Sequence, residues 1–199
     1  MKVKIKKQGQ VKEFKLINSW SDVNLSTWLK LIDFETGTKT EEATETIAAL
    51  SDIPRKLVKE LALSDVANIM SKIGELQAKQ DTNLKRIIEI NDIEYGFHPD
   101  LDSISLGEYA DIEQFIKNGI ETNLPELMAV LYRPIKEKKN DIYIIDAYDG
   151  DIRMRTEEMK QMSAQQVQSA LVFFYNFAKI LSEILPLYLM EKLKETKTQ

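Results

Sequence analysis

His98 is the residue of this chain whose type most directly suggests acid–base chemistry. The sequence contains one histidine and no cysteine. His98 precedes Pro99, and Asp100 two residues later could orient its imidazole as a general base. The pattern shows no strand–turn–helix elbow that would present a serine nucleophile. Because a polar residue before a proline is typical of a strand end, we expect a structural role for His98, with a small soluble enzyme that uses His98 as the alternative.

Three aspartates near residue 150 are the second candidate for chemistry. Asp146, Asp149 and Asp151 form a DxxDGD pattern, and carboxylates beside a glycine can hold calcium. An EF-hand loop needs acids at alternate positions and a glutamate about 12 residues after the first, and this chain lacks that pattern. The absence of cysteine removes thiol nucleophiles, iron–sulfur clusters and cysteine zinc sites. We therefore expect no enzyme activity, no metal site and no cofactor.

Charge and composition restrict the classes of partner. The 199 residues include 27 basic and 32 acidic side chains, a net charge of −5, which is not the footprint of a protein that binds duplex nucleic acid. The lysine-rich segment at residues 136–140 lacks the interleaved aromatic residues of a single-strand binding surface. We expect a globular protein without a nucleic-acid partner.

One segment is long enough to be considered as a membrane span. Residues 170–190 are mostly apolar and have a suitable length. However, Asn176, Lys179 and Glu183 lie near the middle, where each would be costly in hydrocarbon. Lys179 and Glu183 also have the i,i+4 spacing of an ion pair on a solvated helix face. The sequence therefore favours a core helix and predicts no membrane span.

The order of the expected elements repeats along the chain. Pairing Phe14 with Tyr95 gives an offset of 81 residues, and the apolar positions that follow then coincide over about 40 residues without a gap. The repeated unit is a β-hairpin followed by three to four helices. We therefore expect an α+β fold, mostly helical, with two related modules at residues 1–82 and 83–199, which suggests an ancient duplication.

The second copy is longer than the first. Its last helix matches that of the first copy at an offset of 101, from Val66 and Val167, which is 20 more than the first offset of 81. Within the additional residues, 141–148 are typical of a strand, Asp149-Gly150 of a two-residue turn, and residues 152–155 of a return strand. We expect an inserted β-hairpin over residues 141–155 with Asp149-Gly150 at its tip, paired with another sheet edge because a lone hairpin is only marginally stable.

The expected C-terminal helix, residues 163–194, is apolar around most of its circumference. Such a helix must be buried on most sides, and a chain of this size has limited interior to surround it. We expect its outward apolar residues, together with two in the inserted hairpin, to contact another subunit or a partner protein. The candidate interface residues are Phe173, Ile180, Leu187, Tyr143 and Ile145.

Three segments of the second half carry a resemblance to a known group of proteins. They are residues 97–112 (FHPDLDSISLGEYADI), 127–135 (LMAVLYRPI) and 171–175 (LVFFY). Together they resemble small virion and assembly proteins of tailed bacteriophages of Bacteroidota, crAss-like phages among them. The likeness is a loose pattern over about half the chain, and it brings no catalytic motif.

The resemblance implies a function in building a phage particle. The expected protein is a non-enzymatic virion component of the head, neck, tail or cargo that acts by protein–protein contact. The alternative within this class is a tail assembly chaperone that is absent from the mature particle. The implied partners are other phage structural or assembly proteins, or further copies of this chain. The implied location is the virion, or the host bacterial cytoplasm during assembly.

Overall fold

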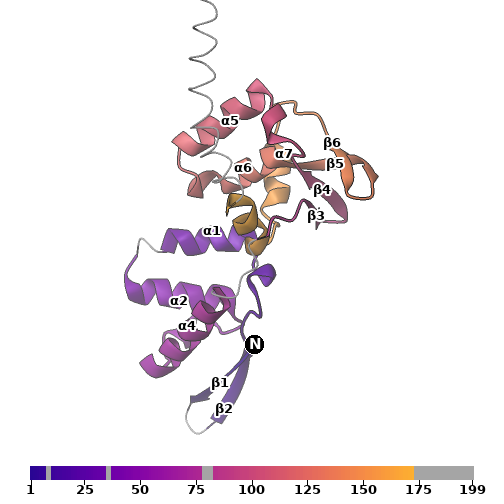
Figure 1. Cartoon of the computed structure of the whole chain (residues 1–199). Helices are drawn as coiled ribbons and strands as arrows, with labels where there is room; N and C mark the ends of the chain where they lie inside the picture. The colour runs from indigo at the N-terminus through magenta and orange to yellow at the C-terminus, as the bar shows by residue number, and fades with distance from the viewer. Residues whose placement is uncertain (8–9, 35–36, 78–82, 173–199) are drawn as a thin grey trace, which may run out of the picture.

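A computed structural model describes residues 1–7, 10–34, 37–77 and 83–172 (Figure 1). The first module begins with a β-hairpin and continues with helices. Its elements are β1 (Lys2–Lys7), β2 (Gln10–Lys15), the 3-10 turn η1 (Trp20–Asp22), α1 (Leu25–Phe34), α2 (Lys39–Leu50), α3 (Arg55–Val58) and α4 (Leu63–Gln77).

The second module has the same order of elements, with two more strands. Its elements are β3 (Ile87–Ile90), β4 (Ile93–Phe97), the 3-10 turn η2 (Leu101–Ser103), α5 (Leu106–Lys117), the 3-10 turn η3 (Glu121–Asn123), α6 (Leu124–Leu131), β5 (Tyr132–Lys139), β6 (Ile142–Ile145) and α7 (Arg153–Met159). A last helix begins at Ala164 and is described as far as Val172. The expected α+β class is confirmed, with a two-stranded sheet and a four-stranded antiparallel sheet in the order β3-β4-β5-β6.

Local sequence explains where the helices begin. Thr38 and Glu41 form a capping box at the start of α2, and Ser105 and Glu108 form one at the start of α5. In each box the hydroxyl accepts from a backbone N–H of the first turn, and the glutamate accepts from the N–H of the capping residue. α6 is apolar on almost every side and is correspondingly buried along its whole length.

The apolar side chains gather in two clusters, one for each module. α1 lies between them, because Leu25 is buried in the cluster of the second module and Trp28 packs against both clusters. Conversely, the last helix, which belongs to the second module, contributes Ala164 to the cluster of the first module. Figure 1 shows α1 and the start of the last helix where the two modules meet. Each module therefore supplies one helix N-terminus to the core of the other.

The backbone reproduces the offset of 81 residues. The Ile17 N–H donates to the Leu50 carbonyl at 3.0 Å, and at the offset positions the His98 N–H donates to the Leu131 carbonyl at 2.7 Å. α1 and α5 begin at offset positions, as their bounds show, and α2 and α6 end at offset positions. Trp28 and Tyr109 also correspond, although both are half-buried rather than fully buried. The matched long-range hydrogen bonds support one register for both modules.

The inserted hairpin is not where the sequence predicts it. β6 pairs with β5, and the turn between them is Asn140-Asp141, where Asn140 has φ 57°. Asp149-Gly150 lies in the loop before α7 instead of at a hairpin tip. There the Asp149 carboxylate accepts from the Asp151 N–H, and Asp151 accepts from the Arg153 N–H at the start of α7. The aspartates favour a helix start at this place, so the expected return strand is helical.

The membrane expectation concerns residues that are mostly outside the described part. No helix among the described residues has the length and apolar character needed to cross a membrane. Of residues 170–190, the structure describes only Ala170, Leu171 and Val172.

Candidate functional site

The side chains most able to do chemistry form a buried cluster in the second module. His98 follows β4, Glu108 lies in the first turn of α5, and Arg133 lies on β5. A guanidinium nitrogen of Arg133 is 2.7 Å from Glu108 Oε1, and His98 Nε2 is 3.4 Å from the same oxygen. All three residues are less than 9% exposed. The cluster therefore joins the end of one strand, the start of a helix and a neighbouring strand.

Glu108 is the centre of this cluster because its carboxylate both caps α5 and contacts the two other side chains. One carboxylate oxygen, Oε2, accepts from the Ser105 N–H at 2.7 Å in the capping box of α5, and the other faces Arg133 and His98. The Ser105–Glu108 spacing was visible in the sequence as a cap. The pairing with Arg133 had no sequence signal, because it depends on β5 lying beside β4.

The electrostatics of the cluster favour an ion pair with a neutral histidine. Burial raises the pKa of Glu108, but hydrogen bonds from Ser105 and the positive charge of Arg133 outweigh it, so this pKa is lowered. Burial lowers the pKa of His98, and the nearby Arg133 adds to this effect, although Glu108 opposes it. Near neutral pH, Glu108 and Arg133 are therefore charged and paired, and His98 is neutral.

Aromatic and polar groups extend the cluster toward α7. Tyr148, in the loop before α7, lies under the Arg133 guanidinium, 5.8 Å from its ring centre, and its hydroxyl donates to Asp111 of α5. Burial and the hydrogen bond to Asp111 raise the pKa of Tyr148. Tyr148 is thus held between two charged side chains and ties the long loop to the face of α5.

The main charged partner of His98 is Glu108 and not the expected Asp100. The carboxylate nearest the imidazole is that of Glu108, whereas the exposed Asp100 acts on His98 by a weaker charge effect and through its backbone. In the described part of the chain no serine hydroxyl is hydrogen-bonded to His98. The arrangement is suited to fixing three elements together.

The aspartates near residue 150 have separate partners. Asp146 pairs with Lys136 at 3.0 Å, and Asp151 pairs with Arg153 at 2.9 Å. Asp149 accepts the Asp151 N–H as described above. Among residues 1–7, 10–34, 37–77 and 83–172, no group of three acidic or histidine side chains is placed to hold a metal ion.

The predicted interface residues divide into two groups. Phe173, Ile180 and Leu187 lie outside the described residues. Tyr143 is buried by its own chain, because its ring packs on Gly96 and its hydroxyl donates to the Phe97 carbonyl at 2.6 Å. Ile145 is half-buried.

The most exposed apolar residues of β6 are Ile142 and Ile144, and not the predicted interface residues Tyr143 and Ile145. Ile142 is 78% exposed and Ile144 is 56% exposed. Ile142 and Ile144 alternate with Tyr143 and Ile145 along the strand, so the two pairs lie on opposite faces. The sequence alone does not tell which of the two faces packs on β4. β6 is also an edge of the four-stranded sheet.

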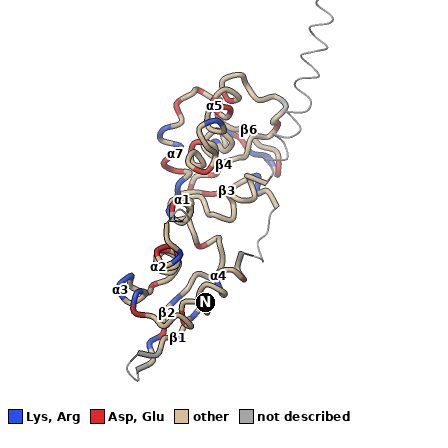
Figure 2. Tube along the Cα trace, turned by 90° about the vertical axis from the view of Figure 1, so that its left-hand side faces the viewer, with Lys and Arg blue, Asp and Glu red and all other residues tan. Residues whose placement is uncertain are grey.

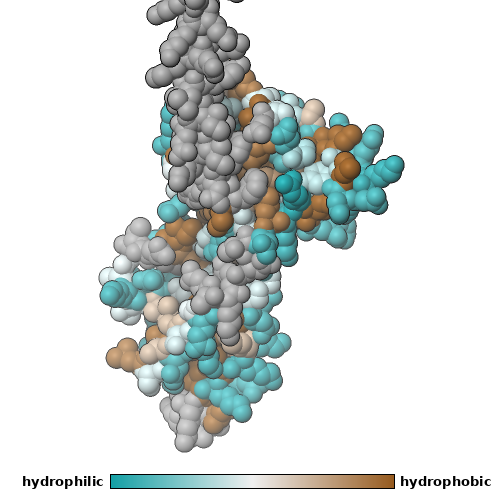
Figure 3. All heavy atoms as spheres, in the orientation of Figure 1, coloured by the Kyte–Doolittle hydropathy of each residue, from teal (hydrophilic) through white to brown (hydrophobic). Residues whose placement is uncertain are grey.

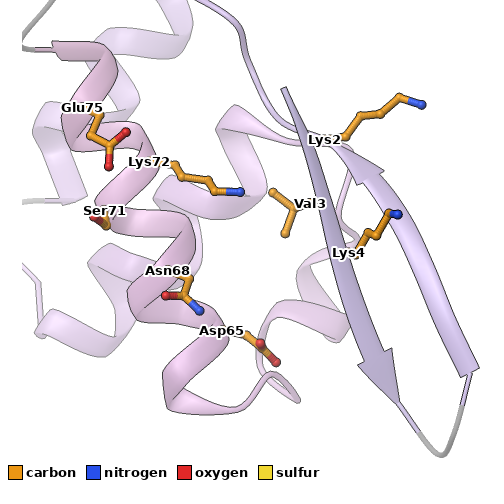
Figure 4. A pocket seen from close by; sticks show the side chains of 8 residues that line it. All are labelled: Lys2, Val3, Lys4, Asp65, Asn68, Ser71, Lys72 and Glu75. Atoms are coloured by element: carbon orange, nitrogen blue, oxygen red, sulfur yellow. The ribbon is translucent and has the colours of Figure 1, made fainter.

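A polar groove lies between β1 and α4 in the first module (Figure 4). Its volume is about 530 Å³. Figure 4 shows Lys72 of α4 extending toward Val3 of β1, whereas Lys2 and Lys4 point away from α4. Asp65 and Glu75 line the groove with Lys72, and this mixture of signs does not single out an anionic or a cationic ligand.

Charge and hydropathy are mixed over the described surface. Figure 2 shows basic and acidic residues interspersed along both modules. Figure 3 shows hydrophobic residues at the surface of both modules beside hydrophilic ones. Comparisons with protein-family models, curated proteins and solved structures found no match. The function is therefore argued from the residues of this chain.

Proposed function

We propose that this protein is a non-enzymatic bacteriophage protein that acts by protein–protein contact as a component of the virion. The observation that carries the proposal is the distribution of its side chains. The sole histidine is enclosed in an ion cluster, while large apolar side chains such as Ile142 and Ile144 are exposed. Exposed apolar groups at a sheet edge are suited to binding another protein. The resemblance of residues 97–112 and 127–135 to phage virion proteins supplies the biological setting.

The edge strand β6 is a suitable place for such a contact. Ile142 and Ile144 lie on one face, opposite Lys139 and Glu137 of β5. A partner strand could add to the free edge by backbone hydrogen bonds and cover both isoleucines. The ion pair between Lys138 and Glu94 holds the other face of β5 against β4, at 2.5 Å. The strand that pairs with β6 is therefore itself held against β4 by an ion pair on the opposite face.

Mass spectrometry of purified phage particles tests the proposal. A virion component should be present at a fixed copy number in particles that have been purified away from cell lysate. A tail assembly chaperone would be abundant in infected cells and absent from mature particles. Absence from particles would therefore overturn the virion role.

Replacement of His98 by Ala tests the enzymatic alternative. If the protein works by contact, phage carrying H98A should form plaques at normal efficiency wherever the variant folds, as monitored by circular dichroism. H98Q serves as a second variant that keeps a polar side chain in the cluster. A loss of viability in both variants with unchanged folding and particle incorporation would favour an enzyme.

A further inference from the structure

The two modules are joined by a short backbone pairing that uses one segment from each. Asn24, at the start of α1, forms an antiparallel bridge with Ser163, at the start of the last helix. The Leu25 N–H donates to the Met162 carbonyl at 2.8 Å, and the Ala164 N–H donates to the Val23 carbonyl at 2.7 Å. We call residues 23–25 the front segment of the first module and residues 162–164 the back segment of the second.

The repeated register places a second front segment and a second back segment in the chain. At the offset of 81, the front segment of the second module is Ile104–Leu106, and at the offset of 101, the back segment of the first module is Leu61–Leu63. Within the described residues these two segments do not pair with each other or with any other strand. Among the described residues, one front and one back of the repeated register are therefore unpaired.

Burial shows that the unused segments differ from the used ones. Leu25 and Ala164 are 0% exposed, whereas their counterparts Leu106 and Leu63 are 83% and 86% exposed. Other matched pairs of apolar residues are buried in both copies: Leu50 and Leu131 are both buried, as are Ile69 and Ala170. The two leucines at the free segments are among the most exposed apolar side chains of the described residues, as expected if these segments lack a partner.

A groove lies beside the free back segment, with an apolar part among charged and polar side chains. It has a volume of about 490 Å³, and Val58, Leu61 and Val66 form part of its lining. The counterparts of these three residues at the offset of 101 are Met159, Met162 and Val167. In the second module they belong to the buried cluster that contains Leu25. The first-module counterparts of residues that share a cluster with Leu25 therefore line an open groove.

The two free segments carry opposite net charge along the chain, although Glu41 and Glu45 also line the groove and Glu45 pairs with Arg55. Residues 55–63 contain three basic side chains and one acidic side chain. Residues 100–107 contain Asp100 and Asp102 and no basic side chain. Opposite net charges would draw the two surfaces together and disfavour pairing of like segments.

We infer that the front segment Ile104–Leu106 of one molecule docks on the back segment Leu61–Leu63 of a second copy of this chain. Leu106 enters the groove beside Val58 and Val66, and Ser105 pairs with Ala62 as Asn24 pairs with Ser163. A front and a back are different surfaces, so the contact is heterologous, and two joined copies together keep one free front and one free back. Such a contact propagates into a ring or a filament. This inference deepens the proposed function by naming a partner, and it rests on that function for its biological setting.

Two charged substitutions test the joint in solution. Wild-type protein should increase in mass with concentration in analytical ultracentrifugation. L106D and L63D should each weaken self-association about tenfold or more, because burial of a leucine is lost at every contact. M154D is the matched control, since Met154 is 84% exposed and lies outside both segments. It should associate as wild type does.

Mixing the two variants distinguishes this joint from other interfaces. L63D retains a functional front and L106D retains a functional back, so an equimolar mixture should form a one-to-one heterodimer at a concentration at which each variant alone is monomeric. Wild-type protein that stays monomeric at high concentration would overturn the inference. So would variants that associate like wild type, or a mixture that remains monomeric while both variants keep their helix content.

The absence of cysteine permits a direct test of register. In the double variant A62C/S105C, oxidation should link successive molecules into a ladder on a non-reducing gel, because paired antiparallel positions have a separation suited to a disulfide. A62C/M154C should give no ladder, and the same result for A62C/S105C would contradict the proposed pairing. Self-association in vitro together with absence from particles would reject the virion role alone. Presence in particles without self-association would reject this joint alone.

Discussion

The two modules share a backbone plan but stabilise it with different side chains. At the closing hydrogen bond the first module has Ile17 where the second has His98. The other members of the ion cluster, Glu108 and Arg133, correspond to Thr27 and Asp52 at the offset of 81. The first module closes with an isolated bridge, Leu16 to Ser51, and the second extends the matching pair into β4 and β5. The comparison indicates that the longer sheet of the second module came with a buried ion pair.

The two modules should differ most in the loss of stability when the ion pair of Glu108 and Arg133 is broken. R133M leaves the Glu108 carboxylate buried without its guanidinium, which should lower the free energy of unfolding by about 3–5 kcal/mol in urea denaturation. D52A, at the matched position of the first module, removes one hydrogen bond from the Lys15 N–H to an exposed carboxylate and should cost much less. Equal losses in the two variants would contradict the special role of the cluster.

The sequence predicts the repeat well because the signals that carry it are local. Apolar spacing and capping residues depend on neighbours within one turn, so the start of α5 at Leu106 follows from Ser105 and Glu108. The hairpin in the insert was misplaced for the same reason. Asp149-Gly150 has a strong local turn preference, but Asn140-Asp141 makes the turn because β5 continues directly from α6 and pairs with β4.

The candidate site was only partly predictable, because it depends on contacts between distant segments. His98 was recognisable by its type, whereas Arg133 gained its role from the pairing of β5 with β4. The backbone pairing that joins the two modules was also not predictable from the sequence. Leu25 and Leu106 are the same residue type at matched positions, and only the structure shows that one is covered and the other is exposed.

A second difference between the modules lies at Gly96, whose counterpart in the first module is Lys15. A Cβ at Gly96 would meet the ring of Tyr143, with Cδ2 at 2.6 Å, and Ile145 Cγ2 at 2.8 Å. G96A should therefore cost about 1–3 kcal/mol of stability, measured by urea denaturation, because β6 must shift. G74A is the control: Gly74 lies in α4 with no atom within 4 Å of an added Cβ, and the substitution should stabilise by about 0.5–1 kcal/mol. A neutral G96A would show that β6 moves freely.

The anchoring of β6 by Tyr143 is a smaller effect that exists only in the second module. The Tyr143 hydroxyl donates to the Phe97 carbonyl at 2.6 Å and lies 3.2 Å from the Arg86 carbonyl. Y143F keeps the ring on Gly96 and removes the hydroxyl, so it should destabilise by about 1 kcal/mol in the same assay. Hydrogen exchange should increase in β6 and remain unchanged in the β1–β2 hairpin. An unchanged exchange rate in β6 would indicate that ring packing alone holds the strand.

The smallest predicted effect is a pH dependence that the first module lacks. His98 has a lowered pKa in the folded protein, first because of burial and then because of Arg133, relative to an ordinary value of 6.5. The unfolded chain therefore binds more protons than the folded chain below about pH 6.5, so stability should fall as the pH decreases from 6.5 toward 5. The pKa of Glu108 is lowered from an ordinary value of 4.5. Protonation of this carboxylate and of others like it therefore changes the stability at a lower pH than protonation of His98 does. In H98Q, urea denaturation should give a nearly constant stability between pH 5 and 7. A similarly flat profile for the wild-type protein would mean that the imidazole gains as much from Glu108 on protonation as it loses by burial beside Arg133.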